Sequence, residues 1–293
     1  MLLAAGWCVV AFFLFMALAY YVPAANWLDD AALHGFVAVG RHPITDIARA
    51  LAYCCNPLPY AVASVITIAA AHKLRGARTA VAVTLMLGGA NLSSQVLKPL
   101  LAHHRELYHT QFKLFNIDNA AYPSGHATAA MSLALAVLII VPRASRPLAA
   151  TLGAIFTISV SFSVLILEWH WPSDVVGGYL IATAWGLATF AALRYANVRW
   201  PERGTMRLAA RQALPAPSAG AIVRVVSALA VVAGLVAASR AHQIAGFADR
   251  HTAFVAVASA IAVAAAVLLA AVVAISSSGS ASSGTGRETR TSR

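Results

Sequence analysis

Three short groups of polar residues interrupt an otherwise apolar chain, and their residue types suit phosphoryl transfer. The first group spaces two cations as Lys98-x6-Arg105. The second is the run Pro-Ser-Gly-His at 123–126, and in the third Trp-Pro-Ser separates His170 from Asp174. Ionisable residues at the edge of a membrane segment are costly, so they call for a functional hypothesis beside the structural one, in which they cap helices or extend to the interface.

Two of these groups supply candidates for holding a phosphate. Lys98 and Arg105 carry positive charge, and arginine adds a planar fork of donors that matches phosphate oxygens. Ser124 and Gly125 lie where a helix is expected to begin, and the unpaired amides of a helix N-terminus bind phosphate. Gly125 has no side chain, so the backbone can approach a ligand closely.

The histidines supply the reacting groups. The carboxylate of Asp174 can accept a hydrogen bond from one imidazole nitrogen of His170, which leaves the other nitrogen free to attack phosphorus. His126 is then available to protonate a leaving oxygen. This set requires no metal, and the three cysteines show neither a zinc spacing nor a disulfide framework.

The segments that must position these residues are typical of membrane helices. The chain has 293 residues, of which 60% are hydrophobic and 11% charged, too apolar a composition for a soluble domain. A helix needs about 20 apolar residues to cross a bilayer. Eight spans are predicted: Leu2–Val22, Pro57–His72, Thr79–Leu101, Ser124–Val141, Leu148–Leu167, Ser173–Leu193, Ala219–Ala238 and Ala253–Ile275. The first could be a signal peptide, but it lacks a basic segment before it, which favours an uncleaved span.

The predicted fold class is an all-α, polytopic transmembrane helix bundle. Residues 1–195 form a six-helix core, and residues 196–218 form a basic linker on the cytoplasmic side. Residues 219–275 add two further transmembrane helices as a membrane appendage, and residues 276–293 are expected to be a disordered tail rich in Ser, Gly and Thr. Residues 23–56 are expected to lie along the membrane interface as an amphipathic cover.

The distribution of charge predicts the orientation in the membrane. A net charge of +11 could indicate nucleic-acid binding, but the cations lie mostly in short loops between apolar segments. With the N-terminus inside, fourteen of the 21 lysines and arginines fall on the inner side, and eight of the ten acids fall outside. We therefore expect a cell-membrane protein with both termini in the cytoplasm and the three polar groups at the outer face.

The order of the three motifs resembles the type 2 phosphatidic acid phosphatase superfamily, with Ser163-x6-His170-x3-Asp174 as its third motif. The resemblance implies a six-helix, metal-independent membrane phosphatase that acts on lipid phosphates or diphosphates without a cofactor. Expected substrates are phosphatidate, phosphatidylglycerol phosphate and polyprenyl diphosphates. It implies that His170 forms a phosphohistidine, that Asp174 orients His170, and that His126 protonates the leaving alcohol. The implied phosphate-binding residues are Lys98, Arg105, Ser124 and Gly125.

Two positions depart from the family pattern. Glu106 follows Arg105 where the family has proline, and Val164 follows Ser163 where the family has an arginine that binds phosphate. A charge-assisted hydrogen bond to phosphate is worth about 1.5–3 kcal/mol, so its loss would slow the reaction without abolishing it. Residues of the outer loop could compensate: Lys113, His103, His104 and His109. Glu168 is unexpected beside a phosphate, and its role stays open.

Three functions are compatible with these residues. The first is phosphatase activity on a lipid phosphate. The second is a lipid phosphotransferase that uses the same phosphohistidine with an alcohol as acceptor. The third is a non-catalytic lipid-phosphate binder or transporter, although a binder has no need of a nucleophile. The expected partners are the lipid phosphate substrate and membrane lipids but no nucleic acid, and the small residues of the last two spans leave a homo-oligomer open.

Overall fold

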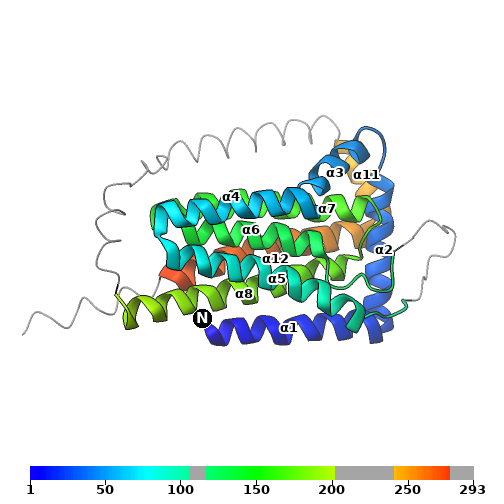
Figure 1. Cartoon of the computed structure of the whole chain (residues 1–293). Helices are drawn as coiled ribbons and strands as arrows, with labels where there is room; N and C mark the ends of the chain where they lie inside the picture. Colours follow the sequence, from blue (N-terminus) through cyan, green and yellow to red (C-terminus); the bar gives the residue numbers. More distant parts are fainter. Residues whose placement is uncertain (106–116, 202–240, 278–293) are drawn as a thin grey trace, which may run out of the picture.

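The computed structural model describes residues 1–105, 117–201 and 241–277, and these residues are helical, without strands (Figure 1). The chain forms the following helices in order: α1 (Leu2–Tyr21), α2 (Pro23–Val39), α3 (Ile44–Tyr53), α4 (Pro57–Arg75), α5 (Ala77–Leu100), α6 (Gly125–Ile140), the 3-10 turn η1 (Arg143–Ser145), α7 (Arg146–Ile166), α8 (Pro172–Arg199), α11 (Ala241–Arg250) and α12 (Thr252–Ser277). The predicted all-α fold class is confirmed.

Each predicted span that falls in the described residues coincides with a helix, whereas the span expected at 219–238 lies outside them. Among the described helices, five are long and apolar enough to cross a membrane. The pair α3 and α4 forms a sixth candidate, with a bend of 52° between its two parts. The remaining helix of the core, α6, is apolar but has only 16 residues. The protein is therefore a multi-pass membrane protein.

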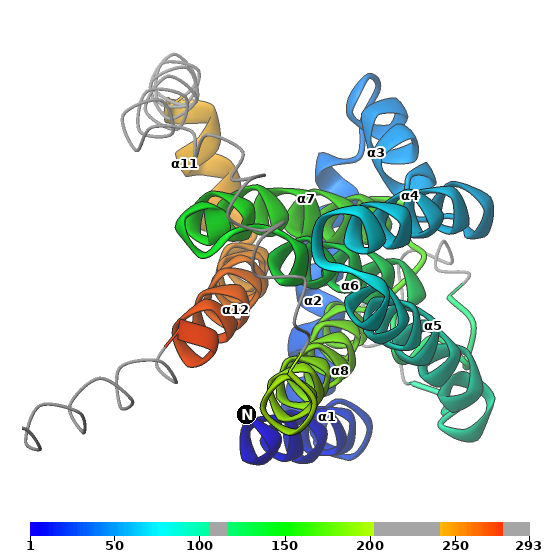
Figure 2. The same cartoon turned by 60° about the vertical axis from the view of Figure 1, so that its left-hand side comes forward.

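Helix α8 lies at the centre of the bundle, between α1, α5 and α6 (Figure 2). In its most apolar window 67% of the residues are buried, against 22–39% in the other four long apolar helices. The close approach to α6 depends on Gly178, because a Cβ atom there would lie 2.7 Å from the backbone oxygen of Ser124. This contact brings the N-termini of α6 and α8 together, and Ser124 N donates to the backbone oxygen of Asp174 at 2.9 Å.

Helix α2 lies across one end of the bundle, roughly perpendicular to the long helices (Figure 1). It contacts α1, α7, α8 and α12, and its inner face is partly polar, because Asn26, Asp29 and Asp30 are buried together with Leu33 and Phe36. We expected residues 23–56 to lie along the membrane interface as an amphipathic cover. Within this segment Asp29 and Asp30 are buried, and Asp29 meets Arg105 and Ser173 of the bundle.

Helix α12 packs against the core rather than standing apart from it. It contacts α7, α2 and α8, and the ring of Phe254 lies 4.8 Å from that of Phe36 in α2. Residues 196–199, at the start of the predicted linker, still belong to α8, and residues 276–277, at the start of the predicted tail, still belong to α12. The rest of the predicted linker and tail lies outside the described residues.

Candidate active site

The pair His170 and Asp174 is built by the start of α8. Trp171 precedes the helix and Pro172 is its first residue, which suits a residue without an N–H group. The Oδ2 atom of Asp174 accepts from the backbone N–H of Trp171 at 2.9 Å and lies 3.4 Å from Nδ1 of His170. Because Nδ1 faces the carboxylate, Nε2 is the nitrogen left to react, as the i, i+4 spacing predicts.

The turn before this pair is formed by the end of α7. Trp169 N donates to Val164 O at 2.9 Å, and Glu168 N donates to Leu165 O at 3.1 Å, which together make a Schellman motif. Glu168 occupies the left-handed position of that motif, with φ of 61°. The motif reverses the chain immediately before His170. Burial raises the pKa of the Glu168 carboxyl, and the nearby His34 opposes this shift.

His126 lies in the first turn of α6, whose N-cap is Ser124 with Oγ accepting from Ala127 N at 3.4 Å. The imidazole of His126 lies 6.4 Å from that of His170, measured between ring centroids, so the structure brings the two predicted histidines together. Nε2 of His126 lies 2.9 Å from Oδ1 of Asn56, the residue that caps α4. An amide oxygen only accepts, so Nε2 carries the proton in this arrangement.

Lys98 lies in the last turn of α5 and reaches the start of α6. A Cβ atom at Gly125 would lie 3.8 Å from Lys98 Nζ and 3.1 Å from Gln95 Nε2. The amino group, the Gln95 amide and the amides that begin α6 therefore surround one small region, as the phosphate-binding prediction requires. Gln95 was not among the predicted residues, although it lies one helical turn before Lys98.

Arg105, the other predicted phosphate ligand, is buried beside the pair rather than open to solvent. Nη1 donates to Asp29 Oδ2 at 2.8 Å and to Ser173 Oγ at 2.9 Å, and Nη2 donates to Asp174 Oδ1 at 2.7 Å. These bonds use three of the five guanidinium N–H donors, so at most two remain for a phosphate. Burial alone would lower the pKa of Arg105, but Asp174 and Asp29 more than offset it and raise the pKa.

Asp29 of α2 is a central residue of this region that the sequence analysis missed. Its carboxylate accepts from Ser173 N at 3.0 Å, from Ser173 Oγ at 2.5 Å and from Arg105. It thereby caps the N-terminus of α8 from another helix, where a negative charge is favourable. Burial raises the pKa of Asp29 to about 6, although Arg105 and Ser173 act in the opposite direction. The only signal in the sequence is a pair of acids in an apolar segment.

The position where the family has an additional arginine holds a buried valine in this chain. Val164 is fully buried in α7. Of the proposed substitutes, Lys113 and His109 lie outside the described residues. His103 stacks on Tyr20 with ring centroids 4.7 Å apart, and with His104 and Arg105 it lines a small cavity of about 100 Å³. These two histidines therefore lie close to Arg105.

In the described part of the chain, no group of three or more His, Cys, Asp or Glu side chains could hold a metal ion. Independence of the reaction from metal stays a prediction from the motif resemblance.

Comparison with known proteins identifies the class of this fold. Residues 79–198, which carry α5 to α8 and every predicted site residue, match the family model of the PAP2 superfamily. A similar solved structure is described as the first transmembrane PAP2 type phosphatidylglycerolphosphate phosphatase from Bacillus subtilis. It superimposes with a TM-score of 0.55 over 65% of this chain and 96% of that chain, at 18% identity. No curated protein sequence matches the chain.

The bundle thus has a fold similar to that of a PAP2-type membrane phosphatase, and residues 79–198 match the PAP2 superfamily model. The resemblance to the type 2 phosphatidic acid phosphatases is confirmed. The similar structure aligns over 96% of its own length but over 65% of this chain. About a third of this chain therefore lies outside the aligned region.

Proposed function

We propose that this protein is a lipid phosphate phosphatase that hydrolyses a lipid phosphate or diphosphate through a phosphohistidine at His170. The observation that carries the proposal is the pairing of His170 Nδ1 with Asp174 Oδ2 at 3.4 Å, with the His126 ring 6.4 Å from His170. A binding protein would have no reason to orient one imidazole with a buried carboxylate and to place a second imidazole opposite it.

In the first half of the reaction, Nε2 of His170 attacks the phosphorus of the bound lipid. The new N–P bond forms as the bond from phosphorus to the lipid oxygen breaks. His126, in its doubly protonated imidazolium form, gives a proton to that oxygen and becomes neutral, so the lipid leaves as an alcohol or, from a diphosphate, as a monophosphate. Asp174 stabilises the positive charge that develops on the His170 ring, since it lies at Nδ1.

In the second half, water hydrolyses the phosphohistidine. His126, now without its proton, takes one from the water while the water oxygen attacks phosphorus and the N–P bond breaks. Inorganic phosphate leaves, and both histidines return to their starting states. The same residue acts as acid in one half and as base in the other, as microscopic reversibility requires.

The phosphate is proposed to bind among Lys98 Nζ, the amides at Ser124 and Gly125, and the remaining donors of Arg105. Asp29 acts as a positioning residue, because it holds Arg105 and the first turn of α8 in one place. Since two carboxylates share the single guanidinium of Arg105, this pocket keeps less free positive charge than one with a further arginine at position 164. We infer that Lys98 and the helix amides bear most of the phosphate charge.

The direction of the site in the membrane is also proposed. The positive-inside rule puts the histidines at the extracytoplasmic face and both termini in the cytoplasm. A substrate lipid would then present its phosphate from the outer leaflet. No metal enters the mechanism, because the two histidines and the cations supply the nucleophile, the acid and the charge.

The proposal is tested by phosphate release from purified full-length protein in detergent. Phosphatidylglycerol phosphate is the first substrate to try, because the similar solved structure is described as a phosphatase for it; phosphatidate and undecaprenyl diphosphate follow. We expect turnover of at least one of them, unchanged by EDTA. Absence of turnover on all three would leave the binder or transporter and overturn the phosphatase.

The phosphotransferase is distinguished in the same assay. Glycerol or another alcohol added at rising concentration would divert the phosphohistidine to a phosphorylated alcohol. A phosphatase gives inorganic phosphate as the main product at all concentrations, whereas a phosphotransferase gives phosphoalcohol with little free phosphate.

A further inference from the structure

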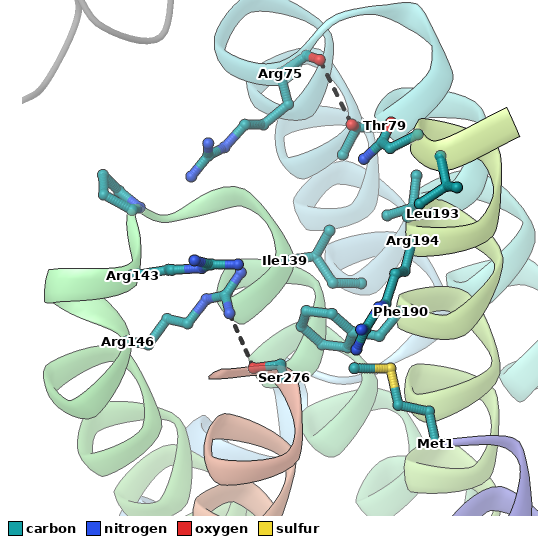
Figure 3. Close-up of a pocket in the computed structure, with 13 residues that line it drawn as sticks. Met1, Arg75, Thr79, Ile139, Arg143, Arg146, Phe190, Leu193, Arg194 and Ser276 are labelled. Carbon is teal, nitrogen blue, oxygen red and sulfur yellow. Dashed lines mark hydrogen bonds between the residues drawn. The ribbon is translucent and has the colours of Figure 1, made fainter. Parts of the chain in front are cut away.

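A second cavity lies at the end of the bundle opposite to the histidines. It has a volume of about 650 Å³ and is formed where α4, α6 and α8 end and where α5 and α7 begin (Figure 3). Helix α6 shows the separation of the two sites, because His126 is in its first turn and Ile139, which lines the cavity, is in its last. The cavity is therefore a site of its own.

Four arginines line this cavity, namely Arg75, Arg143, Arg146 and Arg194. In Figure 3, Arg143 and Arg146 extend side by side from the turn between α6 and α7, with Arg75 on one side of them and Arg194 on α8 across from them. Among the described residues that line the cavity there is no aspartate or glutamate. Positive charges gathered in one concave site favour an anion there, because each of them adds to the positive potential that the anion meets.

Two of these arginines are held in fixed positions. Nε of Arg75 donates to the backbone oxygen of Ile140 at 2.6 Å. Nη1 of Arg146 donates to Ser276 Oγ at 2.9 Å, and its guanidinium lies over the ring of Phe190 at 5.4 Å. Side chains that merely extend toward lipid headgroups from a helix end do not need such anchors.

Arg146 also keeps a donor without a partner. Its Nε atom is buried and has no hydrogen-bond partner among the described residues. Buried polar groups are almost always satisfied, and an exception in a cavity indicates a water or an ion that binds there. The unsatisfied donor is thus a second observation that points to a ligand.

The rest of the lining indicates what kind of anion fits. Thr79, Asn197 and Ser276 add neutral hydrogen-bonding groups beside the arginines, while Phe190, Leu193 and other apolar side chains cover the remaining wall. An amphiphile with a charged head and an apolar body matches this combination. Arginine recognises phosphate through paired donors, which favours a phosphate head over a carboxylate of equal charge.

We propose that this cavity binds the phosphate headgroup of an anionic phospholipid, independently of the histidine site. Helix α12, which follows the PAP2 superfamily segment, contributes one wall through the bond from Arg146 to Ser276. The added helix thereby completes a lipid site on the core. The predicted topology places this site in the cytoplasmic leaflet.

The test is native mass spectrometry of the full-length protein in detergent. The probes are phosphatidylglycerol, phosphatidylcholine with the same acyl chains, and inorganic pyrophosphate. We expect one phosphatidylglycerol to be retained, with an affinity about tenfold or more above that of phosphatidylcholine, because only the first has a net negative charge. Competition by pyrophosphate at similar concentration would instead identify a free phosphate compound as the ligand and overturn the lipid.

The variant Arg143→Gln/Arg194→Gln removes two lining charges at exposed side chains. We expect it to bind phosphatidylglycerol about tenfold more weakly, or worse. The matched control is Lys73→Gln/Arg199→Gln, which removes two exposed charges from the same end of the bundle without touching the cavity lining. The control should bind as the wild type does, and equal loss in both variants would overturn the site.

A second measurement uses only the wild type, so it tests the proposal even where a variant fails to fold. Binding through arginines should weaken steeply as sodium chloride rises from about 0.05 to 0.5 M, since salt screens the charges. Retention of phosphatidylglycerol that does not change with salt would contradict an arginine site.

Discussion

The carboxylate of Asp174 contacts three partners: Arg105, the backbone N–H of Trp171 and His170. One carboxylate oxygen is 2.7 Å from Arg105, and the other accepts from Trp171 N and faces His170. Asp29 adds a second carboxylate on the same arginine. The proposed nucleophile, His170, therefore lies beside a carboxylate that is itself fixed by a guanidinium and a helix N-terminus. Hydrogen bonds to the residue that orients a catalytic side chain keep that side chain in one geometry.

Removal of His126 tests its assignment as the proton donor. We expect His126→Ala to lower kcat on a lipid phosphate by about 10²–10⁴, the usual contribution of general acid catalysis. In a single turnover, the loss in the rate of phosphohistidine formation should be much smaller on p-nitrophenyl phosphate, because p-nitrophenolate leaves without protonation and His126 acts on water only in the second half. His72→Ala, an exposed histidine of α4, is the control and should change neither rate. Equal losses of this first-half rate on both substrates would assign His126 to binding rather than to protonation of the leaving group.

The raised pKa of Asp29 predicts a particular pH dependence of stability. A carboxyl whose pKa is about 6 when folded and near 3.8 when unfolded stabilises the folded state below pH 4, and this contribution is lost as the pH rises through 6. Asp29→Asn removes that dependence. The Tm of the wild type, compared with the variant, should therefore fall as the pH rises from 4 to 7, by an amount equivalent to at most about 3 kcal/mol.

The measurement is thermal unfolding of both proteins in detergent across that pH range. Asp46→Asn serves as the control, because Asp46 is exposed on α3. A difference between wild type and Asp29→Asn that does not change with pH would show that the Asp29 carboxyl is already ionised throughout, held so by Arg105.

The site residues that could be predicted from the sequence are those that lie close to one another along the chain. His170 and Asp174 are four positions apart, and Ser124 to His126 are contiguous, so the helix geometry alone relates them. Asp29 meets Ser173 from 144 positions away, and Asn56 meets His126 from 70 positions away. No periodicity in the chain relates such pairs, because only the packing of α2 and α4 on the bundle brings them together.

At the scale of elements, the link between α7 and α8 determines where His170 lies. The Schellman motif ends α7 with Glu168 in the left-handed region, a position where glycine is usual. A side chain with a Cβ atom is disfavoured there by about 1–2 kcal/mol. The structure shows Glu168 as the left-handed residue of this turn. It shows no further role for the Glu168 side chain.

This turn gives a prediction about stability. Glu168→Gly should raise the free energy of unfolding by up to about 1 kcal/mol, because glycine adopts positive φ without a steric penalty. Glu168→Val should lower it by about 1–2 kcal/mol, since a β-branched side chain fits that region worst. Chemical unfolding followed by tryptophan fluorescence measures both.

The matched control for glycine is Thr151→Gly at an exposed position inside α7. There glycine should destabilise by about 0.5–1 kcal/mol, as it does in any helix interior. If Glu168→Gly destabilises as much as Thr151→Gly, the left-handed turn is not the conformation that the protein adopts.

Element positions were largely predictable because apolar length is a strong signal. The seven described spans lie within a few residues of their predicted ranges. The role of α2 was not predictable, since its partly polar face is equally compatible with the membrane interface and with burial against the ends of other helices. Which of the two applies depends on Arg105 and Ser173, which lie far along the chain.

At the scale of the whole molecule, the two ends of the bundle differ in chemistry. One end holds two histidines with the carboxylates of Asp29 and Asp174, and the other holds four arginines around a cavity. The positive-inside rule predicts that the arginine end faces the cytoplasm. The same charges therefore support both the proposed topology and the proposed lipid site.

Cys54 allows this orientation to be measured without introducing a cysteine. It is exposed at the end of α3, two residues before Asn56, which contacts His126, whereas Cys8 and Cys55 are buried. A membrane-impermeant maleimide should label Cys54 in intact cells if the site faces outward, as we propose. The Cys54→Ser variant provides the background. Labelling only after the cells are opened would place the histidines in the cytoplasm and reverse the proposed topology.

The central claim is that His170 is the nucleophile, and one comparison tests it most directly. Phosphate release from phosphatidylglycerol phosphate, or whichever lipid phosphate the wild type hydrolyses, is measured with purified wild type and His170→Ala in the presence of EDTA. We predict that the wild type remains active and that the variant loses activity by on the order of 10⁴-fold or more, as removal of a nucleophile does. Activity in His170→Ala equal to that of the wild type would contradict the mechanism.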